Sequence, residues 1–143
     1  MRLLIVGTLK GQLTTATKIA MDRGASVTHA DSIHQALAVL RSGRAYLFDV
    51  VEEMWQTVLA KESVTERQRS DLRMAMTHAA QSAARATHMV CEAAGTTSIF
   101  MKSPLERYAR DAEVVTRHNQ LQYVNYEAVG RTVLGLESNS PLF

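Results

Sequence analysis

The chain has 143 residues, 46% of them hydrophobic and 21% charged, with a formal net charge of +2 at pH 7. This length predicts one domain, or one domain and a fragment of another. The near balance of 16 basic and 14 acidic residues, without a basic run, excludes an electrostatic nucleic-acid surface. No apolar stretch approaches the roughly 18 residues of a membrane-spanning helix. The single cysteine, Cys91, excludes an internal disulfide and is typical of the reducing cytoplasm.

Residues 1–31 predict a βαβ segment. Residues 2–6 (RLLIV) and 25–30 (ASVTHA) have the composition of short strands, and residues 12–22 between them have helical spacing. A strand, a helix and a second strand in this order normally pair as parallel strands through a right-handed crossover. This opening, over roughly the first 45 residues, resembles the receiver-like start of a flagellar transcriptional regulator.

A true phosphoreceiver needs clustered carboxylates to hold Mg²⁺ beside the phosphoryl group. The position just after the first strand reads Val-Gly-Thr-Leu at 6–9 and holds no acid. Asp49 stands where a phosphoacceptor would end a third strand, but one carboxylate does not build the metal site. Phosphorelay signalling is therefore the least favoured function for this chain. We prefer to interpret Asp49 as a solvated carboxylate on a helix.

Residues 32–60 are open to two interpretations. AYLFDVV (45–51) has the composition of a third strand, whereas apolar residues recur along the whole stretch at steps of three and four, as in a helix. The helical pattern accounts for more than twenty residues and the strand for seven, so we predict a helix over 32–60. Its stripe consists of Ile33, Leu37, Leu40, Arg44, Leu47, Val51, Met54 and Val58.

A second helix is predicted over about 66–94, and it carries a narrow face of small residues, mostly alanine. Small side chains let a neighbouring helix approach closely. Its start is marked by a capping box, in which either Thr65 pairs with Gln68 or Ser63 pairs with Glu66.

Two more helices are predicted over about 104–120 and 123–134. Ser103 is a suitable N-cap for the first of these, with Pro104 at the first helical position and Glu106 closing a capping box. The predicted fold is mainly α, an antiparallel up-down bundle of four helices preceded by the βαβ segment. We expect the tail over 138–143 to be disordered.

The helix over 104–120 carries the candidate site. Arg107, Asp111 and His118 fall on one face at about 100° per residue, and Arg110 lies beside them. The simplest interpretation is an Arg107–Asp111 pair within the helix, worth a few tenths of a kcal/mol, and a surface histidine. No His-x-x-x-His pair occurs in the chain, so we predict no metal site.

A wider set of motifs suggests more than surface charges. Ala-Ala-Gly at 93–95, SPLERYARD at 103–111, a histidine seven residues later and Y-x-x-V-G-R-x-x-L-G-L at 126–136 form this set. Together they resemble the C-terminal helical domain of the acyl-CoA dehydrogenase superfamily, closest to its flavin-dependent monooxygenase branch. The resemblance covers about residues 32–136 and implies a domain over 32–137.

The resemblance also implies roles for individual residues. His118 would be a catalytic acid-base group near flavin and substrate. Arg107 and Arg110 would bind the cofactor, FAD or FMN, and Asp111 would orient an arginine. The two further domains that form the flavin-binding core in such proteins do not fit in this chain.

Our preferred hypothesis is therefore a truncated or fused piece of a flavin-dependent oxidoreductase or monooxygenase, forming part of a flavin and substrate site. Its partners would be further copies of itself or a flavin-binding core, and a small-molecule substrate. The alternative is a non-catalytic helical interaction or regulatory module with a degenerate receiver-like N-terminus. Whether the chain is itself an enzyme stays open.

Overall fold

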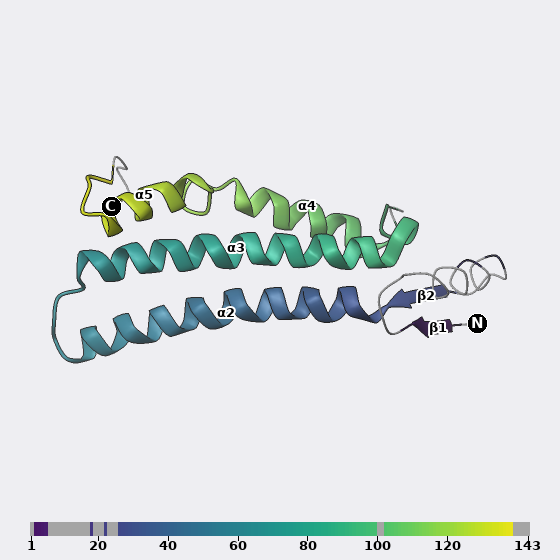
Figure 1. The fold of residues 1–143 in the computed structure, drawn as a ribbon, viewed down its shortest axis with the longest axis horizontal. Helices are drawn as coiled ribbons and strands as arrows, with labels where there is room; N and C mark the ends of the chain where they lie inside the picture. The colour runs from purple at the N-terminus through teal and green to yellow at the C-terminus, as the bar shows by residue number, and fades with distance from the viewer. Residues whose placement is uncertain (1, 6–17, 19–21, 23–25, 100–101, 139–143) are drawn as a thin grey trace.

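The structure, a computed structural model, describes residues 2–5, 18, 22, 26–99 and 102–138 (Figure 1). Two strands, β1 (Arg2–Ile5) and β2 (Ser26–His29), pair in parallel. The helices that follow are α2 (Ala30–Leu59), α3 (Glu66–Ala94), the short 3-10 helix η1 (Gly95–Ile99), α4 (Pro104–Thr116) and α5 (Val124–Val133). No helix in these ranges is both long and apolar enough to cross a membrane.

The helices form three layers with α3 in the middle (Figure 1). α2 and α3, of 30 and 29 residues, run antiparallel and pack along their length. α4 runs back along the other side of α3, and α5 continues beyond it in the same direction, also against α3. The middle helix therefore contacts every other α-helix in the described part of the chain.

Local capping explains where α3 and α4 begin. The Thr65 hydroxyl accepts a hydrogen bond from the Gln68 N–H at 3.2 Å, and the Gln68 side chain accepts one from the Thr65 N–H at 3.0 Å. The predicted Thr65–Gln68 capping box is therefore confirmed. At α4, Ser103 is the N-cap as predicted, but its hydroxyl accepts from Leu105 at 3.3 Å, and Glu106 pairs with an arginine of α4 instead of closing a box.

α2 is helical throughout, which confirms the helical interpretation of 32–60 and excludes a strand at 45–51. The predicted apolar stripe, however, is not its contact face. Ala36, Gly43 and Val50 are buried against α3, whereas Leu37 and Val51 of the stripe are 41% and 46% exposed. Each residue of the actual contact face comes one position before a residue of the predicted stripe. The helices meet there because small residues on both of them allow the closest approach.

Gly43 shows how close this approach is. A Cβ atom added to Gly43 would lie 2.9 Å from the Ser82 Cβ and 3.3 Å from the Ala79 Cα. No side chain fits there without displacing α3, so the contact depends on glycine.

The predicted βαβ segment ahead of the helices is wrong as a description of this fold. The described strands have four residues each and no third neighbour, and so small a pair does not make an independent sheet layer. Only Lys18 and Asp22 of the stretch between the strands are described, so the predicted helix over 12–22 lies largely outside the described residues. β2 passes directly into α2, with no break before the helices.

The four predicted helices are present in order, but the last one takes a different course. α4 ends at Thr116 rather than at 120, and α5 does not reverse direction relative to α4 (Figure 1). The buried Asn125 explains part of this, because its amide donates to the Thr77 hydroxyl of α3 at 3.3 Å and fixes the start of α5 there. The predicted tail over 138–143 lies outside the described residues except for Ser138.

Candidate functional site

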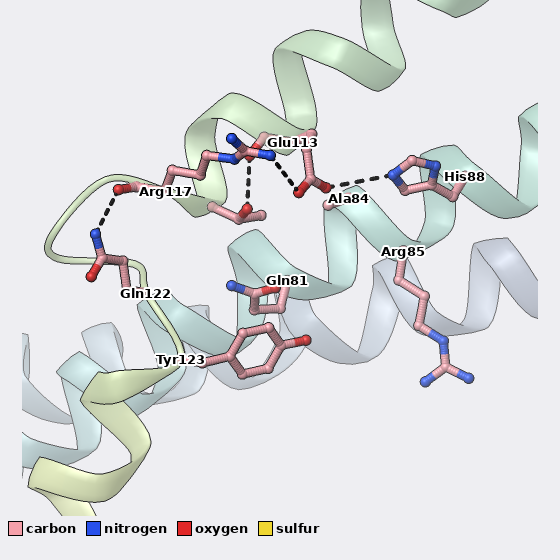
Figure 2. A pocket seen from close by; sticks show the side chains of 9 residues that line it. Gln81, Ala84, Arg85, His88, Glu113, Arg117, Gln122 and Tyr123 are labelled. Atoms are coloured by element: carbon pink, nitrogen blue, oxygen red, sulfur yellow. Dashed lines mark hydrogen bonds and ion pairs between the residues drawn. The ribbon is translucent and has the colours of Figure 1, made fainter.

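A pocket of about 610 Å³ opens between α3 and the turn that joins α4 to α5 (Figure 2). The α3 side presents residues spaced at three and four positions, which therefore share one face of the helix. The other side is formed by the last turn of α4 and the residues after it. The lining residues are Gln81, Ala84, Arg85, His88, Glu113, Thr116, Arg117, Gln122 and Tyr123.

Glu113 is the electrostatic centre of this pocket. One carboxylate oxygen lies 3.5 Å from the His88 Nε2 of α3, and the other lies 3.7 Å from an Nη atom of Arg117 (Figure 2). The carboxylate thereby joins α4 to α3. Because the His88 and Glu113 side chains are 54% and 45% exposed, solvent screens this pairing and each ion pair contributes little stability.

Hydrogen bonds from side chains fix the turn that forms the rim of the pocket. The Gln122 amide donates to the Arg117 carbonyl at 2.8 Å, and the Gln81 amide of α3 donates to the Leu121 carbonyl at 3.2 Å. These bonds satisfy backbone carbonyls of the turn after α4. These bonds hold the turn against α3, and Tyr123, which is 69% exposed, lies at the mouth of the pocket.

Tyr126 lies behind this rim at the start of α5, and its ring centroid is 6.0 Å from that of Tyr123. Burial raises the pKa of Tyr126, and the nearby phenols of Tyr123 and Tyr46 raise it further. On the opposite layer, burial also raises the pKa of Tyr46, followed by the charges of Asp71 and Asp49.

The predicted site residues on α4 lie elsewhere. The Arg107 Nε and an Asp111 carboxylate oxygen are 3.4 Å apart, with side chains 74% and 60% exposed, so the predicted pairing within the helix is confirmed. Arg110 pairs in the same way with Glu106 at 3.7 Å. These three predicted residues are exposed on α4, and none of them lines the pocket.

His118 is also exposed, but it does not share a helical face with Arg107 and Asp111. The prediction of one common face is wrong because α4 ends at Thr116, so His118 lies in the turn beyond it. Its ring nitrogen Nδ1 accepts a hydrogen bond from the Gln120 N–H at 3.3 Å. The structure thus brings Arg107 and Asp111 together and places His118 separately, near the pocket rim.

The sequence did not single out most of the pocket residues. Arg85 and His88 were visible on the small-residue helix, and Glu113 and Arg117 have the four-residue spacing of a helical ion pair. No local pattern in the sequence predicts that α3 contacts the end of α4, which follows more than twenty residues later. The described residues include no group of three potential metal ligands.

A second recess is apolar and lies between α2, α3 and α4, with a volume of about 470 Å³. Residues of the predicted stripe line it, including Leu37 and Leu40, together with Tyr108 of α4. The exposed apolar surface continues along α2 to Trp55, which is 56% exposed.

Two long antiparallel helices, covered on one side by two shorter ones, define a helical-bundle domain. The sequence profile described as "Acyl-CoA dehydrogenase, C-terminal domain" matches residues 6–123, which is most of the chain. The chain therefore belongs to the acyl-CoA dehydrogenase family through this domain, as the motifs at 93–136 predicted.

Individual relatives agree with this assignment. An indole-3-acetate monooxygenase of Pseudomonas putida is 37% identical over 103 residues, which is 72% of this chain and 26% of the relative. A pigment production hydroxylase of Rhodococcus erythropolis is 32% identical over 112 residues, 78% of this chain and 28% of the relative. The chain thus spans about a quarter of the length of these two proteins.

A third relative of this chain belongs to a different class of protein. The transcriptional regulatory protein FlbD of Caulobacter vibrioides is 42% identical over 66 residues, which is 44% of this chain and 14% of that protein. This partial similarity agrees with the predicted resemblance to a flagellar regulator.

Proposed function

We propose that this chain is the C-terminal helical part of a flavin-dependent monooxygenase and supplies one wall of a flavin and substrate site. The family match over residues 6–123 carries the proposal. The names of two relatives, a monooxygenase and a hydroxylase, support oxygen insertion over dehydrogenation. Because the chain spans about a quarter of such proteins, the remaining walls of the site would come from other domains.

The exposed side chains of α4 fit the edge of an anionic cofactor. The guanidinium groups of Arg107 and Arg110 are 74% and 64% exposed, and each pairs with a carboxylate of the same helix, so both can turn toward a phosphate. Asp111 would orient Arg107 through the contact that already exists. FAD or FMN would supply the redox chemistry with oxygen, and these residues would bind and position it.

His118 would hold and deliver a proton in this scheme. Its Nδ1 accepts from the Gln120 N–H, so the proton of the neutral ring would reside on Nε2, and the residue is exposed. A positioned imidazole with one fixed tautomer can act as a general acid or base near neutral pH. The short turn after α4 would be the element that positions it.

The partners follow from the same proposal. The chain would associate with a flavin-binding core or with further copies of itself, act on a small-molecule substrate, and reside in the cytoplasm, where its lone cysteine stays reduced.

The alternative function is that of a non-catalytic interaction module. One observation favours it, because α2 exposes large apolar side chains such as Phe48 and Trp55, each 56% exposed.

Retention of flavin separates the two functions. The chain should be purified alone and after mixing with a Pseudomonas putida indole-3-acetate monooxygenase that lacks its own C-terminal quarter. We expect visible flavin absorbance to elute with the mixed complex, and Arg110→Ala or His118→Ala to reduce either the flavin content or the product formed.

Arg67→Ala is the matched control. Arg67 forms the same type of pair as Arg107, with Asp71 four residues later at 3.7 Å, but on α3. If the complex forms without flavin, or if the control lowers flavin content as much as Arg110→Ala does, the proposed flavin wall is refuted.

A further inference from the structure

The outward side of α2 carries a row of exposed residues that is centred on Phe48. α2 forms an outer layer of the fold and packs against α3 (Figure 1). On the side turned away from α3, seven exposed residues follow at steps of three and four, so all lie within about 40° of Phe48 around the helix axis. We call this row the α2 seam, and it consists of Leu37, Arg41, Arg44, Phe48, Glu52, Trp55 and Leu59.

The charges next to the centre of the α2 seam are of opposite sign and equally spaced. Arg44 lies four residues before Phe48, and Glu52 lies four residues after it. Neither charge forms an ion pair within the described part of the chain. The Arg44 guanidinium carbon lies 4.4 Å from the centroid of the Phe48 ring, and the Glu52 carboxylate accepts a hydrogen bond from Gln56 at 2.7 Å. Both charges therefore remain available to an outside partner.

The outer residues of the α2 seam are matched in the same way. Arg41 and Trp55 lie seven residues before and after the centre, and a cation and an indole ring attract each other when they meet face to face. Leu37 and Leu59 lie eleven residues from the centre, with side chains 41% and 57% exposed. Each residue of the row therefore has its natural partner at the mirror position of the same row.

We propose that two copies of this chain form a two-fold symmetric dimer in which their α2 helices pack antiparallel along this seam. A two-fold axis through Phe48 brings Arg44 of each copy to Glu52 of the other, because such an interface uses the same surface twice. A parallel arrangement would instead place like charges together, which is costly. The contact is roughly 33 Å long at about 1.5 Å per residue.

A second copy fits the α2 seam better than an unrelated surface does. A foreign partner needs charges opposite to those of the row, but nothing requires the row to be complementary to itself. The proposal specifies a surface for the self-association that the proposed function allows. It rests on the residues of α2 alone, since neither flavin nor the exposed arginines of α4 take part in the contact.

The first test is sedimentation equilibrium of the full chain without added flavin. We expect the mass to rise with concentration from 15.8 kDa toward twice that value. Arg44→Glu and Glu52→Arg should each weaken dimerisation by at least about tenfold, because each creates two contacts between like charges in the symmetric dimer. A mass of one chain at every concentration would overturn the proposal.

Mixing the two charge variants tests the antiparallel pairing itself. In a dimer of Arg44→Glu with Glu52→Arg, opposite charges meet at both contacts, so the mixture should dimerise although neither variant does so alone. The double variant should dimerise with itself for the same reason. Asp49→Arg is the matched control, since this exposed residue of α2 lies about 100° from Phe48 around the helix. It should leave dimerisation unchanged.

Cross-linking tests the position of the axis, in a Cys91→Ala background that removes the native thiol. Phe48→Cys should form a disulfide-linked dimer under mild oxidation, because the two residues face each other across the axis. Arg41→Cys should not, because the two copies of this residue would lie roughly 21 Å apart along the helices.

Two further outcomes would overturn the proposal. They are a mixture of charge variants that stays monomeric, and cross-linking of Arg41→Cys with itself. Thermal unfolding of dilute samples shows whether each variant folds, and these exposed substitutions should leave the fold intact. Because no measurement here uses flavin, the dimer and the flavin wall can each fail without the other.

Discussion

The two sides of α3 meet their neighbours in different ways. Toward α2, small side chains such as Ala75 and Ser82 are buried, and the helices approach until Gly43 touches Ser82. Toward α4 and α5, longer polar side chains such as Arg85 and His88 line the contact, and a pocket of about 610 Å³ remains open. One helix therefore forms a tight contact on the face that carries small side chains. It leaves an open pocket on the face that carries long polar side chains.

The largest effect is expected where the helices are closest. Gly43→Leu places a side chain where a Cβ atom alone would already lie 2.9 Å from the Ser82 Cβ, so we expect a loss of unfolding free energy. Overpacking of this kind costs about 3 kcal/mol. Chemical denaturation followed by circular dichroism measures it.

Gly130→Leu on α5 is the matched control. Gly130 has no atom within 4 Å of its added Cβ, and leucine is a better helix former than glycine, so this variant should be neutral or slightly stabilising. Equal losses at both positions would show that close approach of α2 to α3 is not what makes glycine necessary.

A smaller effect is expected on the other side of α3, at Asn125. This residue is 3% exposed, and its amide donates to the Thr77 hydroxyl and to the Asn119 carbonyl, both at 3.3 Å. Asn125→Ala should lower the unfolding free energy by about 1 to 2 kcal/mol, because it leaves the buried Thr77 hydroxyl without this donor. It should also speed hydrogen exchange in the turn over 117–123, and the α2–α3 contact should exchange as before.

A double-mutant cycle with Thr77→Val checks this assignment. If the two substitutions act through their shared hydrogen bond, the double variant should lose less stability than the sum of the single losses. Full additivity would contradict the assignment.

A still smaller effect is expected at Glu113. Because the side chains of its ion pairs are about half exposed or more, Glu113→Gln should change the unfolding free energy by less than about 1 kcal/mol. The substitution should nevertheless change the NMR shifts of His88 and Arg117. Asp111→Asn, which breaks a more exposed pair on α4, is the control and should leave His88 unchanged. No response at His88 would show that the two helices are not joined through this carboxylate.

The smallest effect concerns alkaline pH. The pKa values of Tyr46 and Tyr126 are raised above 10.0 in the folded chain, chiefly by burial. The folded state therefore binds these protons more tightly than the unfolded state, and the resulting stability is complete below pH 10 and is lost as pH rises through the folded-state pKa. Tyr46→Phe should reduce the fall in unfolding free energy above pH 10, whereas exposed Tyr108→Phe should not. An identical pH profile for both variants would refute this account.

Much of the helical fold was predictable because its signals are local. Thr65 and Ser103 marked helix starts through side-chain bonds to nearby backbone groups, and the spacing of apolar residues distinguished a helix from a strand over 45–51. The contact face of α2 was not predictable from hydrophobicity, since the larger apolar residues lie beside it. Gly43, which has no hydrophobic side chain, determines how closely α2 approaches α3.

The candidate site was less predictable for a related reason. Arg107 and Asp111 are four residues apart on one helix, so their spacing alone predicted the contact between them. The end of α4 at Thr116 carries no glycine or proline signal, and it is set by bonds from the turn to α3, such as that of Gln81 to Leu121. Sequence spacing therefore could not show that His118 leaves the helix or that Glu113 reaches His88.

The outward side of α2 determines how the isolated chain responds to its surroundings. Phe48, Val51, Trp55 and Val58 are each 46% to 56% exposed. Full burial of such a side chain stabilises a protein by about 1.5 to 3 kcal/mol. Because these side chains stay partly exposed when this chain folds alone, only part of that free energy is gained. Any surface that shields this row will therefore raise the melting temperature in proportion to how tightly it binds, so thermal stability becomes a direct readout of occupancy on α2.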